Sequence, residues 1–298
     1  MNDIRDDAAS LFCWSFPPAS DGAGRLCVLG APSDAGNAVR RGAADAPRAL
    51  RTASHRCTAL AGVGWDLGDL LRVPYEHPER YMQRLGEAIG RIAEGGHVPL
   101  LLGGDHSLSF AAIETLQRHA PLCVVWLDAH TDFSPWKAGS SHNHRQVLRR
   151  VLTLPGVSRV IQIGYRGITV GDERQLGPRA KVITTQQARS QPVTTLLESI
   201  PADTPIYLSL DIDVIDPQWV PGTSAPVPDG LPPGQVLEIA LALVETGRLV
   251  GVDLMELNPR LDINGRSTDL ACHLLERIAG MWPRSQAISE ELQGSRSR

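Results

Sequence analysis

Cysteine is scarce in this sequence: its 298 residues include five, and no two of them form a CxxC pair. An odd number of widely spaced cysteines argues against a disulfide framework and favours a reducing compartment, so we expect a cytoplasmic protein. Long apolar runs are also lacking, because no stretch approaches the ~20 apolar residues of a membrane-spanning helix. The first residues, 1–7, are acidic and lack the pattern of a secretory signal. We therefore expect no membrane partner.

The sequence has no excess of positive charge, since its net charge is −4 at pH 7. Proteins that bind nucleic acids carry a basic face, so we expect no nucleic-acid partner. Tandem repeats, low-complexity tracts and linkers rich in glycine and serine are absent from the sequence. With 42% hydrophobic residues, the chain is long enough for one large core or for two domains.

Apolar runs that fit buried strands alternate along the chain with segments of helical periodicity. The predicted strands are residues 26–29, 67–70 (an edge strand or a turn), 98–102, 122–127, 160–163, 182–183, 206–210 and 249–254. The predicted helices are residues 45–50, 78–93, 108–119, 146–152, 187–200, 233–245 and 267–281. This alternation is typical of an α/β fold, a parallel sheet with helices on both faces. In such sheets, ligands bind beyond the carboxyl ends of the strands.

Three potential metal ligands, spaced two residues apart, directly follow the predicted strand 122–127. Alternate side chains of an extended backbone point to the same side, so Asp128, His130 and Asp132 can converge on one point. Two carboxylates flanking an imidazole suit a divalent ion such as Mn²⁺, Zn²⁺, Co²⁺ or Ni²⁺. Taken alone, the triplet is also compatible with a capped strand end and a solvated histidine.

Two further strand ends supply ligands of the same kind. His106 follows one strand after a Gly-Gly turn, which lets the backbone approach a packed site closely. Asp211 and Asp213 follow another strand and alternate in the same way. Four carboxylates and two imidazoles cannot be buried together without cations, because each unpaired buried charge costs several kcal/mol. The set predicts a binuclear metal site.

With these residues in place, the sequence resembles the ureohydrolase superfamily, which includes arginase, agmatinase, guanidinobutyrase and formimidoylglutamase. The resemblance runs from Leu26 to Met281 and rests on the motifs GGDHS (103–107), DAHTD (128–132), SLDIDVIDP (209–217), PGTSAP (221–226) and MELNP (255–259). It implies the three-layer αβα arginase-like fold with an eight-stranded, mostly parallel sheet. It also implies a homo-oligomer, a trimer or a hexamer. We expect a single domain over 1–298, with an irregular segment at 1–24 and a frayed tail at 284–298.

The resemblance also implies how the ligands are shared between two Mn²⁺ ions per chain. One ion would be held by His106, Asp128, Asp132 and Asp211, and the other by His130, Asp128, Asp211 and Asp213. Asp128 and Asp211 would bridge the ions. Asp132 would also orient the water that attacks the central carbon of the substrate, and carry its proton onward.

Three more residues are candidates for contact with the substrate. Glu256 matches the family position that contacts the guanidinium; the alternative is a surface glutamate that caps a loop. His144 is the expected proton shuttle, because His-x-Gln at a helix start resembles the His-Gly-Gln of arginases, and His142 is the alternative. Arg166 could pair with a carboxylate tail of the substrate, although it could equally be a structural arginine that bridges loops.

The residues with which arginases recognise the amino-acid head group are missing. Ser134 stands where they have asparagine, and the loop 165–170 has no aspartate at the matching positions. We therefore expect an enzyme that hydrolyses a C–N bond of a small guanidino substrate other than arginine, of the agmatine or guanidino-acid type, to urea and an amine. A formimidoyl substrate, cleaved to formamide and glutamate, is the alternative. Three other functions are less expected: arginase activity, a deacylase with one zinc ion, and a homologue without catalytic activity. The complete ligand set argues against the last two.

Overall fold

The computed structural model describes residues 4–5, 10–16, 24–37, 40–56, 60, 63–135, 142–166 and 176–296 of the chain. Within them, one sheet has the strand order β1-β3-β2-β4-β9-β8-β5-β6-β7. Its strands are β1 (Ile4–Arg5), β2 (Leu26–Gly30), β3 (Gly64–Leu70), β4 (Val98–Leu102), β5 (Leu122–Leu127), β6 (Val157–Tyr165), β7 (Ala180–Thr184), β8 (Ile206–Asp211) and β9 (Leu249–Met255). Strands β2 to β9 are parallel, and the two-residue β1 pairs antiparallel with β3 at one edge. The predicted eight-stranded, mostly parallel sheet is therefore confirmed, with β1 as an addition.

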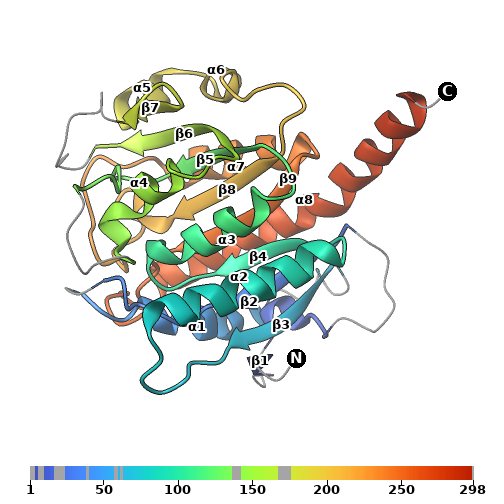
Figure 1. The fold of residues 1–298 in the computed structure, drawn as a ribbon. Coiled ribbons are helices and arrows are strands. Elements are labelled where there is room, and N and C mark those ends of the chain that lie inside the picture. The colour runs from blue at the N-terminus through green and yellow to red at the C-terminus, as the bar shows by residue number, and fades with distance from the viewer. Residues whose placement is uncertain are drawn as a thin grey trace.

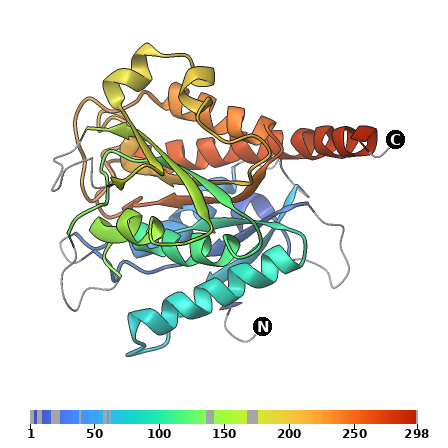
Figure 2. The same cartoon turned by 45° about the horizontal axis from the view of Figure 1, so that its top comes forward.

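Helices cover both faces of the sheet and complete three layers (Figures 1 and 2). One face is covered by α2 (Pro78–Glu94), α3 (Ser109–Leu116) and α4 (Val147–Val151). The other is covered by α1 (Ala46–Ser54), α5 (Thr185–Ser190), α6 (Val193–Leu197), α7 (Pro233–Glu245) and α8 (Arg266–Arg296). The αβα arrangement confirms the expected α/β class.

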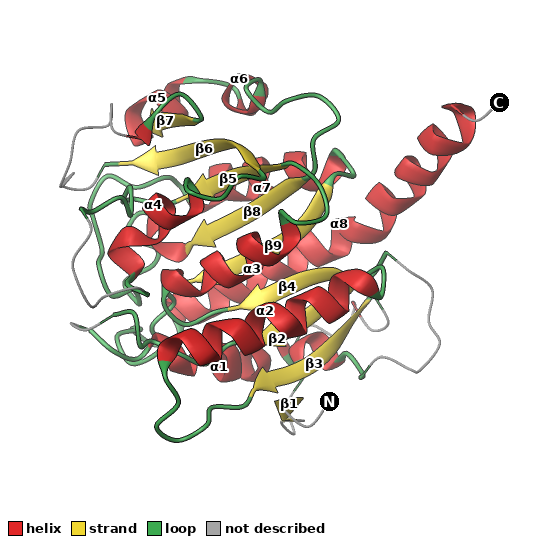
Figure 3. Ribbon diagram, in the orientation of Figure 1, coloured by secondary structure: helices red, strands yellow, loops and turns green. Residues whose placement is uncertain are grey.

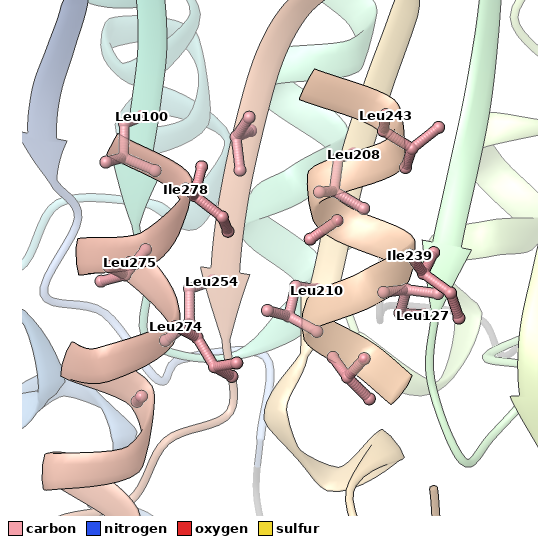
Figure 4. Close-up of a cluster of buried hydrophobic side chains, with 14 of the residues drawn as sticks. Leu100, Leu127, Leu208, Leu210, Ile239, Leu243, Leu254, Leu274, Leu275 and Ile278 are labelled. Atoms are coloured by element: carbon pink, nitrogen blue, oxygen red, sulfur yellow. The ribbon is translucent and has the colours of Figure 1, made fainter. Parts of the chain in front are cut away.

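The apolar strand runs are explained by these two helical layers, because successive residues of a strand face opposite layers. Leu208 and Leu210 of β8, two residues apart, lie on the face of the sheet that α7 covers. They belong to the same core cluster as Ile239 and Leu243 of α7 (Figure 4). Tyr207, which precedes Leu208 in β8, belongs to the core on the other face. Burial of each such side chain stabilises the fold by about 1.5–3 kcal/mol.

The carboxyl ends of the parallel strands lie together at one edge of the sheet, on the left in Figure 3. In the strand order, β9 lies between β4 and β8, and β5 lies beside β8. Neighbouring strands are about 4.8 Å apart. The residues that follow β4, β5, β8 and β9 are therefore brought within reach of one another, although they are far apart in the sequence.

The predicted helix 187–200 is wrong in its extent. The structure has two short helices, α5 and α6, separated at Gln191 and Pro192. Proline disfavours a helical conformation in the residue before it and cannot donate a backbone hydrogen bond. Pro192 is therefore the N-cap of α6 rather than part of a longer helix.

The structure describes parts of the two chain ends that were predicted to be irregular or frayed. Much of 1–24 lies outside the described residues, but Leu11–Cys13 form a 3₁₀ turn, and Leu11 and Phe12 are fully buried. At the other end, α8 continues through Arg296, so the described part of the predicted frayed tail is helical (Figure 1). Residues with high helix propensity are common in this part of the sequence. None of the helices in the described ranges combines the length and the apolar character of a membrane-spanning helix.

Candidate metal centre and active site

The first group of metal-ligating side chains surrounds His106, at the end of β4. Its Nδ1 atom lies 3.0 Å from an oxygen of Asp211, 3.2 Å from Asp128 and 3.5 Å from Asp132. These residues follow three different strands, β4, β5 and β8. The imidazole nitrogen and the carboxylates therefore converge as the strand order requires.

The second group surrounds His130 and shares Asp128 with the first. The Nδ1 atom of His130 lies 3.0 Å from Asp213 Oδ2 and 3.5 Å from Asp128 Oδ1. Asp128 thus turns one carboxylate oxygen to each histidine. Backbone amides hold these carboxylates in place: the amide of Ala129 donates to Asp213, and that of His130 donates to Asp128. The structure brings all six predicted metal ligands together.

The chemistry of this donor set fits divalent cations. His106 Nδ1 is buried and faces oxygens of Asp128, Asp132 and Asp211, an arrangement that suits a nitrogen and carboxylates that share one metal ion. Burial and the carboxylates of Asp213 and Asp128 raise the pKa of Asp211 well above its usual value. The protein's own groups therefore leave the cluster short of positive charge, and two divalent ions would supply it.

The Gly103-Gly104 turn is required by close packing at this edge. A Cβ atom on Gly103 would lie 1.8 Å from the sulfur of Met255, and one on Gly104 would lie 1.9 Å from the carbonyl oxygen of Ser33. The carbonyl of Gly104 accepts a hydrogen bond of 2.8 Å from the amide of Glu256. The turn thus fixes the end of β4 against the end of β9, which places Glu256 beside His106.

A chain of buried hydrogen bonds orients His106. The hydroxyl of Ser209 donates to Asp253 at 2.9 Å, so it accepts from Nε2 of His106, also at 2.9 Å. The tautomer with a free lone pair on Nδ1 is thereby selected. Tyr207 donates to the other oxygen of Asp253 at 2.6 Å.

Trp126 supports the same histidine from β5. Its ring is stacked on the imidazole of His106, with centroids 4.1 Å apart and planes inclined by 9°. Its indole N–H donates to Asp128 at 2.9 Å. Trp126, Ser209 and Asp253 have no role in the sequence interpretation. A carboxylate inside the apolar run of β9 is the signal that could have revealed Asp253, because a buried charge needs partners.

Glu256 and His144 form a hydrogen-bonded pair in the same pocket as the candidate metal ligands. Nδ1 of His144 lies 3.1 Å from Oε1 of Glu256, which also accepts the backbone amide of His106 at 3.0 Å. Although burial acts to lower it, the Glu256 carboxylate raises the pKa of His144 to about 9. His144 is therefore a cation at neutral pH. The alternative that Glu256 is a surface residue fails, because Glu256 is buried.

His142, the alternative shuttle, lies elsewhere. Its Nδ1 atom is 2.7 Å from the guanidinium of Arg150. Burial and the charge of Arg150 lower the pKa of His142 to about 4. His142 also does not line the pocket that contains the metal ligands, whereas His144 does. Of the two histidines, the structure thus brings His144 to the site.

Arg166, predicted either to contact a substrate tail or to bridge loops, is bonded to the backbone. Its guanidinium donates to the backbone carbonyls of Asp213, Val214, Ile215, Val227, Pro228 and Gly164. These bonds occupy its N–H groups, and Arg166 does not line the pocket. Arg166 is a structural arginine that ties the loop after β6 to the segments after β8, as the other interpretation of this residue holds.

One pocket opens onto the cluster and joins the metal ligands to the Glu256–His144 pair. Its lining is His130, Thr131, Asp132, Ser134, His144, Arg145, Asp211, Asp213, Ala225 and Glu256. Burial, with the Asp128 carboxylate nearby, raises the pKa of Asp132 to about 8. Asp132 and Glu256 both have positive φ, 46° and 61°. Such strained backbone in residues other than glycine is concentrated at functional sites.

Comparison with known proteins agrees with this geometry. A model of the arginase family matches residues 25–280. The chain belongs to the arginase family. Agmatinase of Gallus gallus is 32% identical over 274 residues, which cover 86% of this chain and 80% of the relative. Guanidino acid hydrolase of Homo sapiens is 31% identical over 279 residues, covering 87% and 79%. Both relatives are mitochondrial by name.

A solved member of the family shares the whole architecture. The proclavaminate amidino hydrolase from Streptomyces clavuligerus has a TM-score of 0.84 and 27% sequence identity to this arginase-family protein, covering 94% of this chain and 99% of that one. The arginase-like fold expected from the sequence is therefore confirmed.

Proposed function

We propose that this arginase-family protein hydrolyses a guanidino compound other than arginine, releasing urea and an amine. The observation that carries the proposal is a pocket lined both by His130, Asp132, Asp211 and Asp213, four of the six candidate metal ligands, and by the Glu256–His144 pair. The cluster would hold the ions that activate a water nucleophile. The pair supplies a carboxylate anion, Glu256, and a proton donor, His144. A guanidinium group requires all of these, because it is cationic, resonance-stabilised and has an amine as its leaving group.

His106, Asp128, His130, Asp132, Asp211 and Asp213 would hold two divalent ions, and we propose Mn²⁺. When bound, such ions neutralise the carboxylates and lower the pKa of a water molecule so that it is a nucleophile near neutral pH. The carboxylate of Asp132 points into the pocket and can hold and accept the proton of the attacking water.

The Glu256–His144 pair serves the substrate. One oxygen of Glu256 is occupied by His106 and His144, so the other oxygen can accept hydrogen bonds from the planar guanidinium. His144 carries a proton at neutral pH, because its pKa is raised to about 9. It can donate this proton to the departing amine, which leaves as a neutral molecule.

The substrate is proposed from the lining of the pocket and from the relatives. Ser134 lines the pocket where arginases have asparagine, so the expected recognition of an amino-acid head group is missing. Relatives that are at least 30% identical include an agmatinase and a guanidino acid hydrolase. Both names support a guanidino substrate.

The test is a substrate panel with purified, Mn²⁺-loaded protein. It contains agmatine, 4-guanidinobutyrate, 3-guanidinopropionate, arginine and formimidoylglutamate, with urea and formamide measured separately. We expect urea from at least one of the first three and little from arginine. Formamide without urea would overturn the proposal in favour of the formimidoyl alternative. Protein stripped of metal and reloaded is the control.

We also propose that the protein is a homo-oligomer, a trimer or a hexamer, as the family resemblance implies. Light scattering coupled to size exclusion gives the mass directly. A monomer at micromolar concentration would contradict this expectation without affecting the proposed reaction.

A further inference from the structure

One charged residue lines the pocket besides the candidate metal ligands and the Glu256–His144 pair. The remaining lining residues are Thr131, Ser134, Arg145 and Ala225. Arg145 is thus a positive charge at the part of the pocket that the catalytic groups do not occupy. Its side chain is exposed, as expected for a residue at the mouth.

The backbone of Arg145 is fixed on both sides. Its amide donates to the side chain of Asn143 at 2.9 Å. Its carbonyl accepts from the amide of Ser134 at 2.8 Å. The residue follows His144 in the same 3₁₀ turn (η5, His144–Gln146). The guanidinium therefore starts from a rigid position directly beside the proton donor.

Neighbouring arginines show how Arg145 differs. Arg149 donates to the carbonyls of Phe133 and Ser134, and Arg150 lies 2.7 Å from His142. Both guanidinium groups therefore make contacts that hold the loops in place. In the described part of the chain, the guanidinium of Arg145 makes no hydrogen bond or ion pair. Its charge is available to a ligand.

We infer that Arg145 binds a carboxylate at the far end of the substrate, so that the substrate is a short-chain guanidino acid. This inference rests on the proposed function, because it assumes that the guanidinium lies at Glu256. A carboxylate can form charge-assisted hydrogen bonds with the arginine fork. The ammonium of an aminoalkylguanidine such as agmatine would instead face a like charge. Arg145 thus takes the role that the sequence suggested for Arg166.

The experiment uses three substrates that share a guanidinium and an aliphatic chain but differ in the tail: 4-guanidinobutyrate, butylguanidine and agmatine. We expect kcat/KM of the wild-type protein to be highest for 4-guanidinobutyrate. In Arg145→Gln, the ratio of kcat/KM for 4-guanidinobutyrate to that for butylguanidine should fall about tenfold, the lower end for a charge-assisted contact at an exposed site. Arg145→Glu should turn the preference towards agmatine.

Two controls separate recognition from a structural effect. Arg145→Lys keeps the charge and should hold the ratio within about threefold of the wild type. Arg118→Gln removes an exposed arginine in the turn after α3 that does not line the pocket and should leave the ratio unchanged. Added salt should lower the ratio in the wild type and not in Arg145→Gln, because exposed charges are screened.

The outcomes distinguish this inference from the proposed function. If the wild type prefers agmatine, or if Arg145→Gln keeps the wild-type ratio, Arg145 does not select a carboxylate, while urea production still supports the proposed function. If none of the three substrates releases urea, this inference fails; if 3-guanidinopropionate also gives no urea, the proposed function fails as well.

Discussion

The two histidines of the metal centre lie in different surroundings. The side chain of His106 is 0% exposed, whereas that of His130 is 28% exposed. His106 is stacked on Trp126 and bonded through Ser209 to Asp253. The described residues place only carboxylates at the ring of His130.

This difference indicates that the two halves of the cluster have different tasks. The inner half, around His106, is built like part of the core, and its hydrogen bond to Ser209 and stacking on Trp126 hold the imidazole in place. The outer half, around His130, lines the pocket. We therefore expect the inner ion to be retained and the outer ion to exchange. Five substitutions test this comparison.

Asp128→Asn should have the largest effect, because Asp128 belongs to both halves. An amide cannot supply the negative charge that two cations share, so both ions should be lost on desalting. We expect kcat/KM to fall roughly 10³-fold or more, equivalent to several kcal/mol of lost charge stabilisation. Metal content and urea release measure the two effects. Asp203→Asn, at an exposed loop position, is the matched control, and full activity in Asp128→Asn would contradict the bridging role.

His106→Ala and His130→Ala compare the halves directly. His106→Ala leaves buried carboxylates without their histidine and should lower the free energy of unfolding by about 3 kcal/mol. His130→Ala removes a partly exposed group and should cost about 1 kcal/mol or less. Denaturant unfolding of the metal-free proteins gives both values. After desalting, we expect about one ion in His130→Ala. Equal destabilisation by the two substitutions would remove the distinction between the halves.

Ser209→Ala should weaken the inner half more moderately. It leaves Nε2 of His106 without its acceptor, and loss of such supporting contacts reduces metal affinity about 10–100-fold. Competition with a chelator measures the affinity of each ion separately. Ser190→Ala, at an exposed position in α5, should have no effect. A change confined to the outer ion would show that the hydrogen-bond chain does not act through His106.

Trp126→Phe should have the smallest effect. Phenylalanine preserves an aromatic ring against His106 but loses the N–H that donates to Asp128. A hydrogen bond to a charged group contributes about 1.5–3 kcal/mol to stability, and the unpaired oxygen can turn to a cation instead. We expect a fall of about 1 kcal/mol in unfolding free energy with metal bound, and activity within about tenfold of the wild type. Complete loss of the inner ion would mean that the indole N–H is essential.

The convergence of the six candidate metal ligands could be predicted from the sequence because it depends on local rules. Alternation in an extended backbone brings Asp128, His130 and Asp132 together, and a parallel sheet brings its carboxyl ends to one edge. Both rules need only short stretches of sequence. The helix 233–245 was predictable for the same reason, and its observed bounds, Pro233–Glu245, are identical.

Residues whose role depends on distant packing could not be predicted in this way. Arg166 was open to two interpretations, because no sequence pattern shows that six backbone carbonyls surround its guanidinium. The role of Arg145 was not predicted, because no sequence pattern shows that its guanidinium lacks a hydrogen-bond or ion-pair partner in the described part of the chain. Ser209 and Asp253 are neighbours only because β8 and β9 pair in a particular register.

The positive φ angles of Asp132 and Glu256 have a consequence for how this chain can change. Side chains other than glycine are disfavoured in that conformation by roughly 1 kcal/mol or more. A sequence selected for folding alone would place glycine at both positions. Substitutions to glycine that stabilise the fold would therefore remove two side chains that line the pocket. A homologue without activity could accept both substitutions and become more stable.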